Sequence, residues 1–269
     1  MKQRYMVIDV SLCHDCNNCF MSCKDEHVGN KWLPYTNEQP RHGHRWMNIH
    51  HTERGQFPRI DVCYLPMPCQ HCQDAPCAHA HPECISRRED GIVMIDTVKA
   101  KGVKELVNSC PYGAIYWNEE AKIAQKCTLC AHLLDGSEEV TIPRCAHSCP
   151  TGAIVFYTLE PQEMEKKIQE EGLEIYRPEW ATSPNVFYKN LYRFEKAFVA
   201  GGILQNNECA EGVEVTLQGN GAKHSQLTDC FGDFKFDALL PGEYAIIIGG
   251  KEVKKVQVTI SVNVGTIAI

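Results

Sequence analysis

The chain has 269 residues, 43% of them hydrophobic and 23% charged, and its formal net charge is −7 from 34 acidic and 27 basic side chains. This balance lacks the basic excess typical of a nucleic-acid-binding protein. No apolar run approaches the ~18 residues needed to cross a bilayer, and the mean hydropathy is −0.32. No signal peptide is visible before the first predicted strand, so we expect a cytoplasmic protein without direct membrane insertion.

Cysteine is the residue type that carries chemistry in this sequence. Twelve of the sixteen cysteines fall into motifs with the spacing of [4Fe-4S] ligands. The motifs, in chain order, are Cys13-x2-Cys16-x2-Cys19-x3-Cys23, Cys69-x2-Cys72-x4-Cys77, the single Cys110 before Pro111, and Cys127-x2-Cys130-x14-Cys145-x3-Cys149 before Pro150. The middle of the chain holds four cysteines where a tandem pattern would hold eight, which predicts three clusters rather than four.

The spacing also predicts which cysteines share a cluster. A loop with thiolates at i, i+3 and i+6 wraps three corners of a cube, and in two-cluster ferredoxins the fourth cysteine of each run ligates the other cluster. The same exchange predicts Cys13, Cys16, Cys19 and Cys149 for cluster 1, Cys23, Cys127, Cys130 and Cys145 for cluster 2, and Cys69, Cys72, Cys77 and Cys110 for cluster 3.

The fourth cluster of a tandem pattern is replaced here by other side chains. Three of the missing ligand positions are found by counting back from Cys110 with the ferredoxin spacing, and they hold Leu106, Val103 and Ala100. The fourth lies four residues after Cys77 and holds His81. One imidazole facing three aliphatic groups cannot hold a cluster. We therefore interpret His81 as a structural histidine rather than a ligand.

Disulfides and zinc are the alternative uses of so many cysteines. Disulfide frameworks suit small secreted chains, whereas 269 residues can bury a large core. A zinc ion takes four ligands, which two Cys-x2-Cys pairs supply. A zinc site would therefore not explain the third cysteine six residues after the first, or the fourth cysteine before proline. The pattern favours iron-sulfur clusters. Cys63 and Cys84 stand outside the motifs and are expected to bind none.

A pseudo-repeat predicts two ferredoxin-like modules, one inserted in the other, over residues 1–160. The run CPYGAI at 110–115 recurs as CPTGAI at 149–154. Each run is interpreted as a last cluster ligand, a proline that stops a helix, a glycine turn and the start of a strand. Outward strands are expected at 5–10 and 91–96.

An insertion at 24–62 separates the first two motifs. It contains five of the twelve histidines: His27, His42, His44, His50 and His51. No carboxylate or cysteine stands at matching ligand spacing beside them, so we favour a surface loop or strand that touches a partner over a metal site. A strand is predicted at 48–52 and a turn at 53–55.

Residues 161–198 are predicted to form a helix and an aromatic linking arm. Pro161, the acidic first turn and Gly172 predict a capped helix over 161–171. Aromatic residues crowd 173–198 without periodicity. This arm packs either on its own domain or against a partner subunit, where aromatic residues are enriched.

Residues 199–269 are predicted to form an all-β domain, which makes the chain an α+β protein. Strand-like runs separated by Gly, Asn and Asp turns lie at 200–204, 213–217, 234–237, 244–248 and 253–260. The segment 229–244 resembles prealbumin-like sandwich domains. Cys209 and Cys230 are expected to pack or to lie at turns rather than bind metal.

The cysteine arrangement resembles the electron-transfer subunits of the dimethyl-sulfoxide-reductase family of molybdopterin oxidoreductases. Within that family, the runs CHDCNNCFM at 13–21, GHRWMNI at 43–49, RCAH at 144–147 and KNLYRFEK at 189–196 resemble the small subunits of pyrogallol-phloroglucinol transhydroxylases. The resemblance implies a heterodimer. Its large partner subunit would carry molybdenum on two molybdopterin guanine dinucleotides and would bind the polyphenol.

The sequence contains no Gly-rich nucleotide loop, nucleophile elbow or paired-carboxylate motif, so we predict no catalytic residue in this chain. Its role is then electron transfer for a partner enzyme. Two other functions remain open: an electron relay for a related molybdenum reductase or catechol dehydroxylase, and a non-catalytic binding protein in which the clusters are structural.

Overall fold

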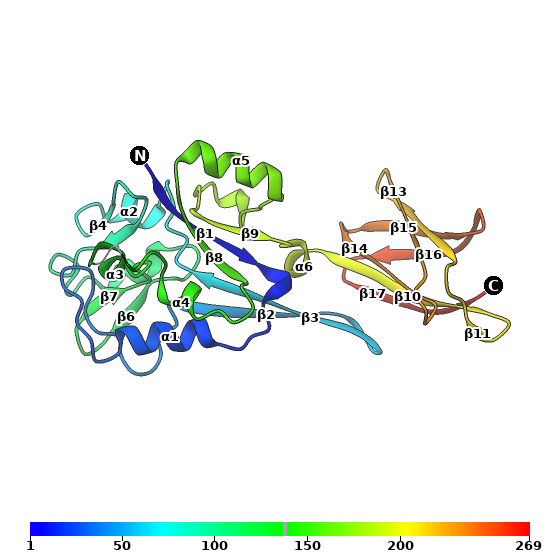
Figure 1. Ribbon diagram of the computed structural model, residues 1–269, viewed down its shortest axis with the longest axis horizontal. Coiled ribbons are helices and arrows are strands. Elements are labelled where there is room, and N and C mark those ends of the chain that lie inside the picture. The colour runs from blue at the N-terminus through cyan, green and yellow to red at the C-terminus, as the bar shows by residue number, and fades with distance from the viewer. Residues whose placement is uncertain (137–138) are drawn as a thin grey trace. The chain divides into compact units, whose positions relative to one another are not determined.

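The computed structural model describes residues 1–136 and 139–269, and within them the chain forms two compact units (Figure 1). Unit 1 comprises Met1–His50 and Tyr64–Leu191, and unit 2 comprises His51–Cys63 and Tyr192–Ile269. All twelve cysteines of the predicted clusters belong to unit 1. Unit 2 contains the C-terminal strands together with a short piece of the 24–62 insertion, which the sequence had not associated with them.

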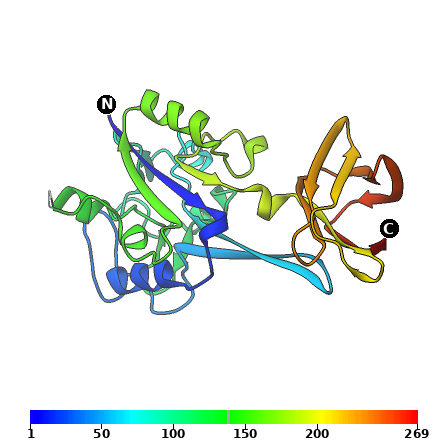
Figure 2. The same cartoon turned by 45° about the vertical axis from the view of Figure 1, so that its right-hand side comes forward.

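A three-stranded sheet forms one part of unit 1. Its central strand β1 (Gln3–Asp9) pairs antiparallel with β8 (Ile154–Leu159) and parallel with β9 (Val186–Lys189). The helix α5 (Pro161–Glu171) runs beside this sheet in both views (Figures 1 and 2). The side chains that join helix and sheet in one core are Tyr5, Val7, Met164, Leu173 and Phe187.

The capped helix predicted at 161–171 is confirmed. Glu160 and Glu163 form a reciprocal capping box at its start, with Pro161 at the first helical position. The helix ends at Gly172, which adopts the left-handed conformation with φ 60° that glycine accepts without steric cost.

The strand β9 lies where the sequence predicted no regular structure. It has four residues, and Val186, Phe187 and Tyr188 are all buried, so no alternation of apolar and polar residues marks it as a strand. Tyr188 is fully buried, and its hydroxyl accepts a hydrogen bond from Gln70 at 3.1 Å. The aromatic segment 173–191 therefore packs on its own unit.

Short elements and the loops between them carry the cysteines of unit 1. They are η1 (Val10–Leu12), α1 (Asn18–His27), α2 (Pro76–Ala80), β4 (Ile85–Arg87), β5 (Val93–Ile95), η2 (Lys104–Ser109), β6 (Tyr116–Asn118), β7 (Ile123–Gln125), α3 (Ala131–Gly136), α4 (Arg144–His147) and η3 (Pro178–Trp180). β4 pairs with β5 and β6 with β7, both antiparallel, and α1 packs against α4. None of the helices in the described part of the chain is long and apolar enough to span a membrane.

The insertion folds as a hairpin of β2 (Met47–Gln56) and β3 (Arg59–Pro68). The turn predicted at 53–55 is wrong, because β2 continues through Gly55 and the chain reverses at 57–58. Gly55 has φ 94°, and a side chain there would collide with the carbonyl of Arg59 and the ring of Phe198. A glycine that resembles a turn residue in sequence is here required by close packing within a strand.

Unit 2 is built mainly of strands. They are β10 (Ala197–Gln205), β11 (Glu208–Cys209), β12 (Glu214–Gly219), β13 (Ala222–Leu227), β14 (Asp233–Leu239), β15 (Gly242–Ile248), β16 (Lys251–Val258) and β17 (Val262–Ala268), after the short helix α6 (Tyr192–Glu195). One sheet has the order β13-β12-β15-β16. The other has the order β11-β10-β14, with β17 parallel to β10. The five predicted strands all overlap observed ones.

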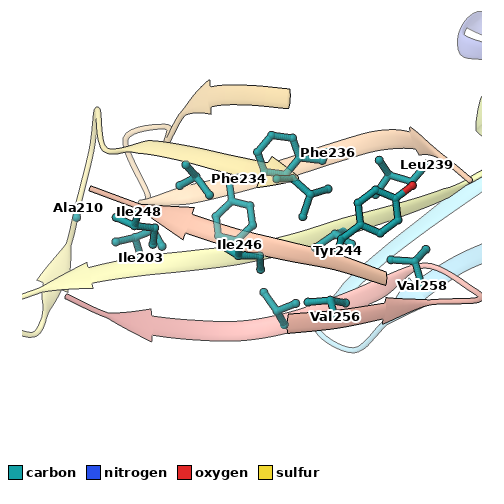
Figure 3. Close-up of a cluster of buried hydrophobic side chains, with 14 residues drawn as sticks. Ile203, Ala210, Phe234, Phe236, Leu239, Tyr244, Ile246, Ile248, Val256 and Val258 are labelled. Carbon is teal, nitrogen blue, oxygen red and sulfur yellow. The ribbon is translucent and has the colours of Figure 1, made fainter. Parts of the chain in front are cut away.

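Both sheets of unit 2 contribute to one hydrophobic core (Figure 3). Ile203 and Phe234 come from one sheet, and Tyr244 and Ile246 from the other. The strand β13, which the sequence analysis missed, is exposed along most of its length and shows no apolar alternation. Cys230 lies in a turn, as expected, whereas Cys209 is exposed on β11.

Candidate iron-sulfur sites

The cluster 1 cysteines lie where η1, α1 and α4 begin or end. Asp15 and Asn17 adopt left-handed conformations with φ 54° and 59°, which Asp and Asn tolerate better than other side chains and which curl the loop. Burial raises the pKa of the Cys19 thiol to about 12, and the nearby Cys13, Cys149 and Cys16 add to the rise. The four sulfurs of the set thus lie within electrostatic reach of one another, and Cys16 is exposed.

The repeated CPxGAI turn places hydrogen-bond donors around a cysteine sulfur. Burial by itself raises the pKa of Cys149, but the Thr151 hydroxyl and the backbone N–H groups of residues 151, 153 and 154 bring the pKa below its usual value. In the first copy, burial raises the pKa of Cys110, and backbone N–H groups of Tyr112 and Ala114 oppose that rise. The turn therefore stabilises the thiolate form at both positions, which is the form that binds iron.

The cluster 2 cysteines line one cavity. Cys23 comes from α1, Cys145 from α4, and Cys127 and Cys130 from the loop before α3. Burial raises the pKa of Cys127 to about 11 and that of Cys130 to about 12. Burial also raises the pKa values of Cys23 and Cys145 well above the usual value, and the neighbouring thiols of the same set contribute to both.

The cluster 3 cysteines come from the loop after β3, from α2 and from the end of η2. Burial raises the pKa of Cys72 to about 12, with contributions from Cys69, Cys110 and Cys77. Burial and Cys69 raise the pKa of Cys77 to about 11. The structure therefore places Cys69, Cys77 and Cys110 within electrostatic reach of Cys72.

These sites fit [4Fe-4S] clusters by their donor chemistry. A buried thiolate without a counter-charge is costly, and iron supplies that charge when it binds. Around the cluster 2 cavity, Gln39 Nε2 lies 3.8 Å from the Cys23 sulfur, and Trp46 Nε1 and His27 Nδ1 are buried without a partner among the described residues. Such donors suit the acceptor sulfurs of a cluster. Within the described residues, no three His, Cys, Asp or Glu side chains are grouped to share a single metal ion.

The histidines of the insertion are not uniformly at the surface, so the predicted surface loop is wrong for two of them. His27 is 1% exposed and lines the cluster 2 cavity, and burial together with His132 lowers its pKa to about 3. His44 is 5% exposed, and its Nε2 lies 3.0 Å from the carbonyl oxygen of Trp117. Sequence analysis missed His27 and Trp46 as neighbours of the cysteines, although His27 stands one helical turn after Cys23 on α1.

An apolar core occupies the region of the missing fourth cluster. Ala100 and Leu106 are fully buried there, and Val103 packs against the same core. His81 ends α2, and its Nδ1 lies 3.5 Å from a carboxylate oxygen of Glu83. Cys84 is buried in this core, and its thiol donates to the carbonyl of Lys99.

Convergent cysteines on a ferredoxin-like pattern define an iron-sulfur protein, and comparison with known proteins agrees. Residues 60–159 match the family described as "4Fe-4S dicluster domain". Over 250 residues the chain is 55% identical to the pyrogallol hydroxytransferase small subunit of Pelobacter acidigallici, covering 92% of this chain and 91% of that protein. The chain belongs to the family of that small subunit, one of the iron-sulfur subunits of dimethyl-sulfoxide-reductase-type enzymes.

More distant relatives are subunits of other oxidoreductases. One subunit of the sulfite dehydrogenase of Allochromatium vinosum is 31% identical over 70% of this chain and 83% of that protein. One subunit of the tetrathionate reductase of Salmonella typhimurium is 31% identical over 74% of this chain and 76% of that protein. The family predicted from the cysteine motifs is thereby confirmed.

Proposed function

We propose that this chain is the electron-transfer subunit of a pyrogallol-phloroglucinol transhydroxylase whose active site lies on a separate large subunit. The observation that carries the proposal is the 55% identity to the pyrogallol hydroxytransferase small subunit, which extends over 92% of this chain and therefore includes both units. The two relatives named for sulfite and tetrathionate enzymes are 31% identical and cover less of the chain.

The chain holds three [4Fe-4S] clusters in the ligand sets given above. The mutual effect of the cysteines on their pKa values supports each set, and the common cavity supports the set of cluster 2 in particular. The core around Ala100 and Leu106 supports the number three, because fully buried aliphatic side chains leave no ligand for a fourth cube.

The large subunit carries molybdenum on two molybdopterin guanine dinucleotides, and this cofactor supplies the hydroxyl-transfer chemistry. The residues of this chain hold the clusters, bury six of the twelve cysteine ligands and place fixed charges around them. Hydroxyl transfer between polyphenols is redox-neutral overall. The clusters therefore set or restore the oxidation state of the molybdenum rather than deliver electrons at each turnover.

Unit 2 is a prealbumin-like sandwich appended to the iron-sulfur unit. Its two four-stranded sheets around one core support this assignment. The domain organisation is then a double ferredoxin-like region over 1–160 with the insertion 24–62, the segment 161–198, and the β domain 199–269, to which the hairpin tip 51–63 is added.

Metal analysis of the complex purified through this chain tests the proposal. We expect twelve iron atoms and twelve sulfides per chain, because each of three cubes holds four of each, together with molybdenum in the partner. The complex should convert pyrogallol without an external electron donor. Iron near sixteen atoms would contradict the number of clusters, and a complex that acts on tetrathionate or sulfite but not on pyrogallol would favour the relay function.

A further inference from the structure

Lys126 is a buried lysine beside the cysteine sets. It is 3% exposed, although it immediately precedes Cys127 of the cluster 2 set. Its Nζ donates hydrogen bonds to the carbonyl oxygens of Val93 at 2.5 Å and of Cys127 at 3.0 Å. Two carbonyl oxygens satisfy its donors in part but supply no negative charge. A buried cation in this position needs an anionic neighbour, which the clusters provide when bound.

The charge of Lys126 acts on cysteines of two different sets. Burial raises the pKa values of Cys77, Cys110 and Cys127, and Lys126 opposes that rise in all three. Cys127 belongs to the cluster 2 set, and the other two belong to the cluster 3 set. The cluster 1 cysteine Cys19 owes its raised pKa to burial and to the thiols of its own set. By geometry, this one cation is hydrogen-bonded to the carbonyl of Cys127 in the cluster 2 set and is connected through Val93 to His71 in the cluster 3 loop.

The strand β5 holds the lysine in place. The carbonyl of Val93 accepts the Lys126 hydrogen bond, and the N–H of the same residue donates to His71 Nδ1 at 3.1 Å. His71 lies within the cluster 3 loop and is fully buried, and its Nδ1 accepts the hydrogen bond from Val93, so this ring nitrogen carries no proton. Val93 therefore links the loops of both clusters and fixes the ammonium near them.

We propose that Lys126 raises the reduction potentials of clusters 2 and 3 together by a fixed positive charge. A [4Fe-4S] cluster with four thiolate ligands gains one electron on reduction and so becomes more negative. A nearby cation stabilises the reduced form more than the oxidised form, and the effect is strong where water is excluded. The charge of Lys126 therefore shifts both potentials in the same direction. The inference rests on the proposed ligand sets.

The test is a redox titration of the whole complex, with the reduced clusters followed by electron paramagnetic resonance. In Lys126→Met the ammonium is lost at similar side-chain length, and in Lys126→Gln an uncharged donor to the two carbonyls is kept. Both should lower the potentials of clusters 2 and 3 and leave that of cluster 1 and the iron content unchanged. Lys126→Arg keeps the charge and should restore both potentials. Lys122→Met, which removes an exposed lysine after β6, should change none.

The outcomes separate this inference from the proposed function. Iron content and the number of signals in the unsubstituted complex test the three-cluster assignment alone. Unchanged potentials in Lys126→Met and Lys126→Gln with full iron content would overturn the role of Lys126. So would an equal drop in Lys126→Arg, because charge would not be the cause. Loss of cluster 2 or 3 in both uncharged variants would show that Lys126 acts by holding the backbone, and would also overturn it.

Discussion

Arg54 on β2 and Asp237 on β14 form a bidentate ion pair, with Nη1–Oδ1 2.8 Å and Nη2–Oδ2 3.0 Å, although 183 residues separate them in sequence. Arg54 Nη2 also donates to Asp61, and Nη1 donates to the carbonyl of Lys196. The Arg54 side chain is only 5% exposed. This network ties the hairpin tip 51–63 to the C-terminal strands and makes it an integral part of unit 2.

Replacing Arg54 with Met should destabilise unit 2 by about 3 kcal/mol, because two largely buried carboxylates would lose their most buried cationic partner and keep only the more exposed Lys235 and, for Asp61, Arg193. The measurement is hydrogen exchange of the β14 amides in the full complex, which should become faster while the amides of β1 do not change. Arg59→Met is the matched control: that side chain is 40% exposed in its pair with Asp233 and should cost less than about 1 kcal/mol. Equal effects of the two changes would contradict the role of the buried pair.

The same network predicts an acid-sensitive unit 2. Burial raises the pKa of Asp61, but hydrogen bonds from Arg54 and Lys235 outweigh it and lower the pKa from 3.8 to about 2. A carboxyl whose pKa is lower in the folded state stabilises the fold above its unfolded pKa and loses that contribution as the pH falls. Stability should therefore fall between about pH 4 and pH 2. Pepsin cleavage within 197–269 should accelerate over this range, and less steeply in Asp61→Asn; equal slopes would contradict the assignment.

Ligand exchange between the first and last motifs predicts crossed effects of two substitutions. Cys149→Ala should damage cluster 1 and spare cluster 2, whereas Cys23→Ala should damage cluster 2 and spare cluster 1. Cys145 and Cys149 flank the end of α4, yet Cys145 lines one cavity with Cys23, Cys127 and Cys130, whereas Cys149 contributes to the raised pKa of Cys19. Paramagnetic resonance of the reduced complex distinguishes the clusters. If both substitutions removed the same signal, the crossed assignment would be wrong.

The segment 173–191 should be required for cluster 3. Thr182 is 2% exposed, its hydroxyl lies 2.7 Å from that of Tyr112, and it hydrogen-bonds the Cys72 sulfur. A chain ending at Gly172 also loses β9 from the sheet and should lose the iron of cluster 3, which iron analysis would detect. A chain ending at Leu191 keeps all of these contacts and should retain three clusters. Full iron content in the shorter chain would show that the segment does not protect the site.

Much of the candidate site could be predicted because iron-sulfur ligation is encoded by short spacing. The twelve cysteines, the CPxGAI turn and the capped helix at 161–171 all depend on residues a few positions apart, so the sequence alone indicates them. The strand β9 and the continuation of β2 through Gly55 could not be predicted in this way. Their residues are buried by segments distant in sequence, and that burial removes the alternation by which strands are predicted.

By itself, the sequence determined that this is an iron-sulfur subunit, which cysteines are its candidate ligands and where its C-terminal β domain begins to within a few residues. Only the tertiary structure decided that Lys126 is buried, that His27 lines a cavity with Cys23, Cys127, Cys130 and Cys145, and that Arg54 belongs to the C-terminal unit. Spacing fixes which residues can meet within a loop. The burial of a charge and its pairing with a distant carboxylate depend on the tertiary packing of segments that are far apart in sequence.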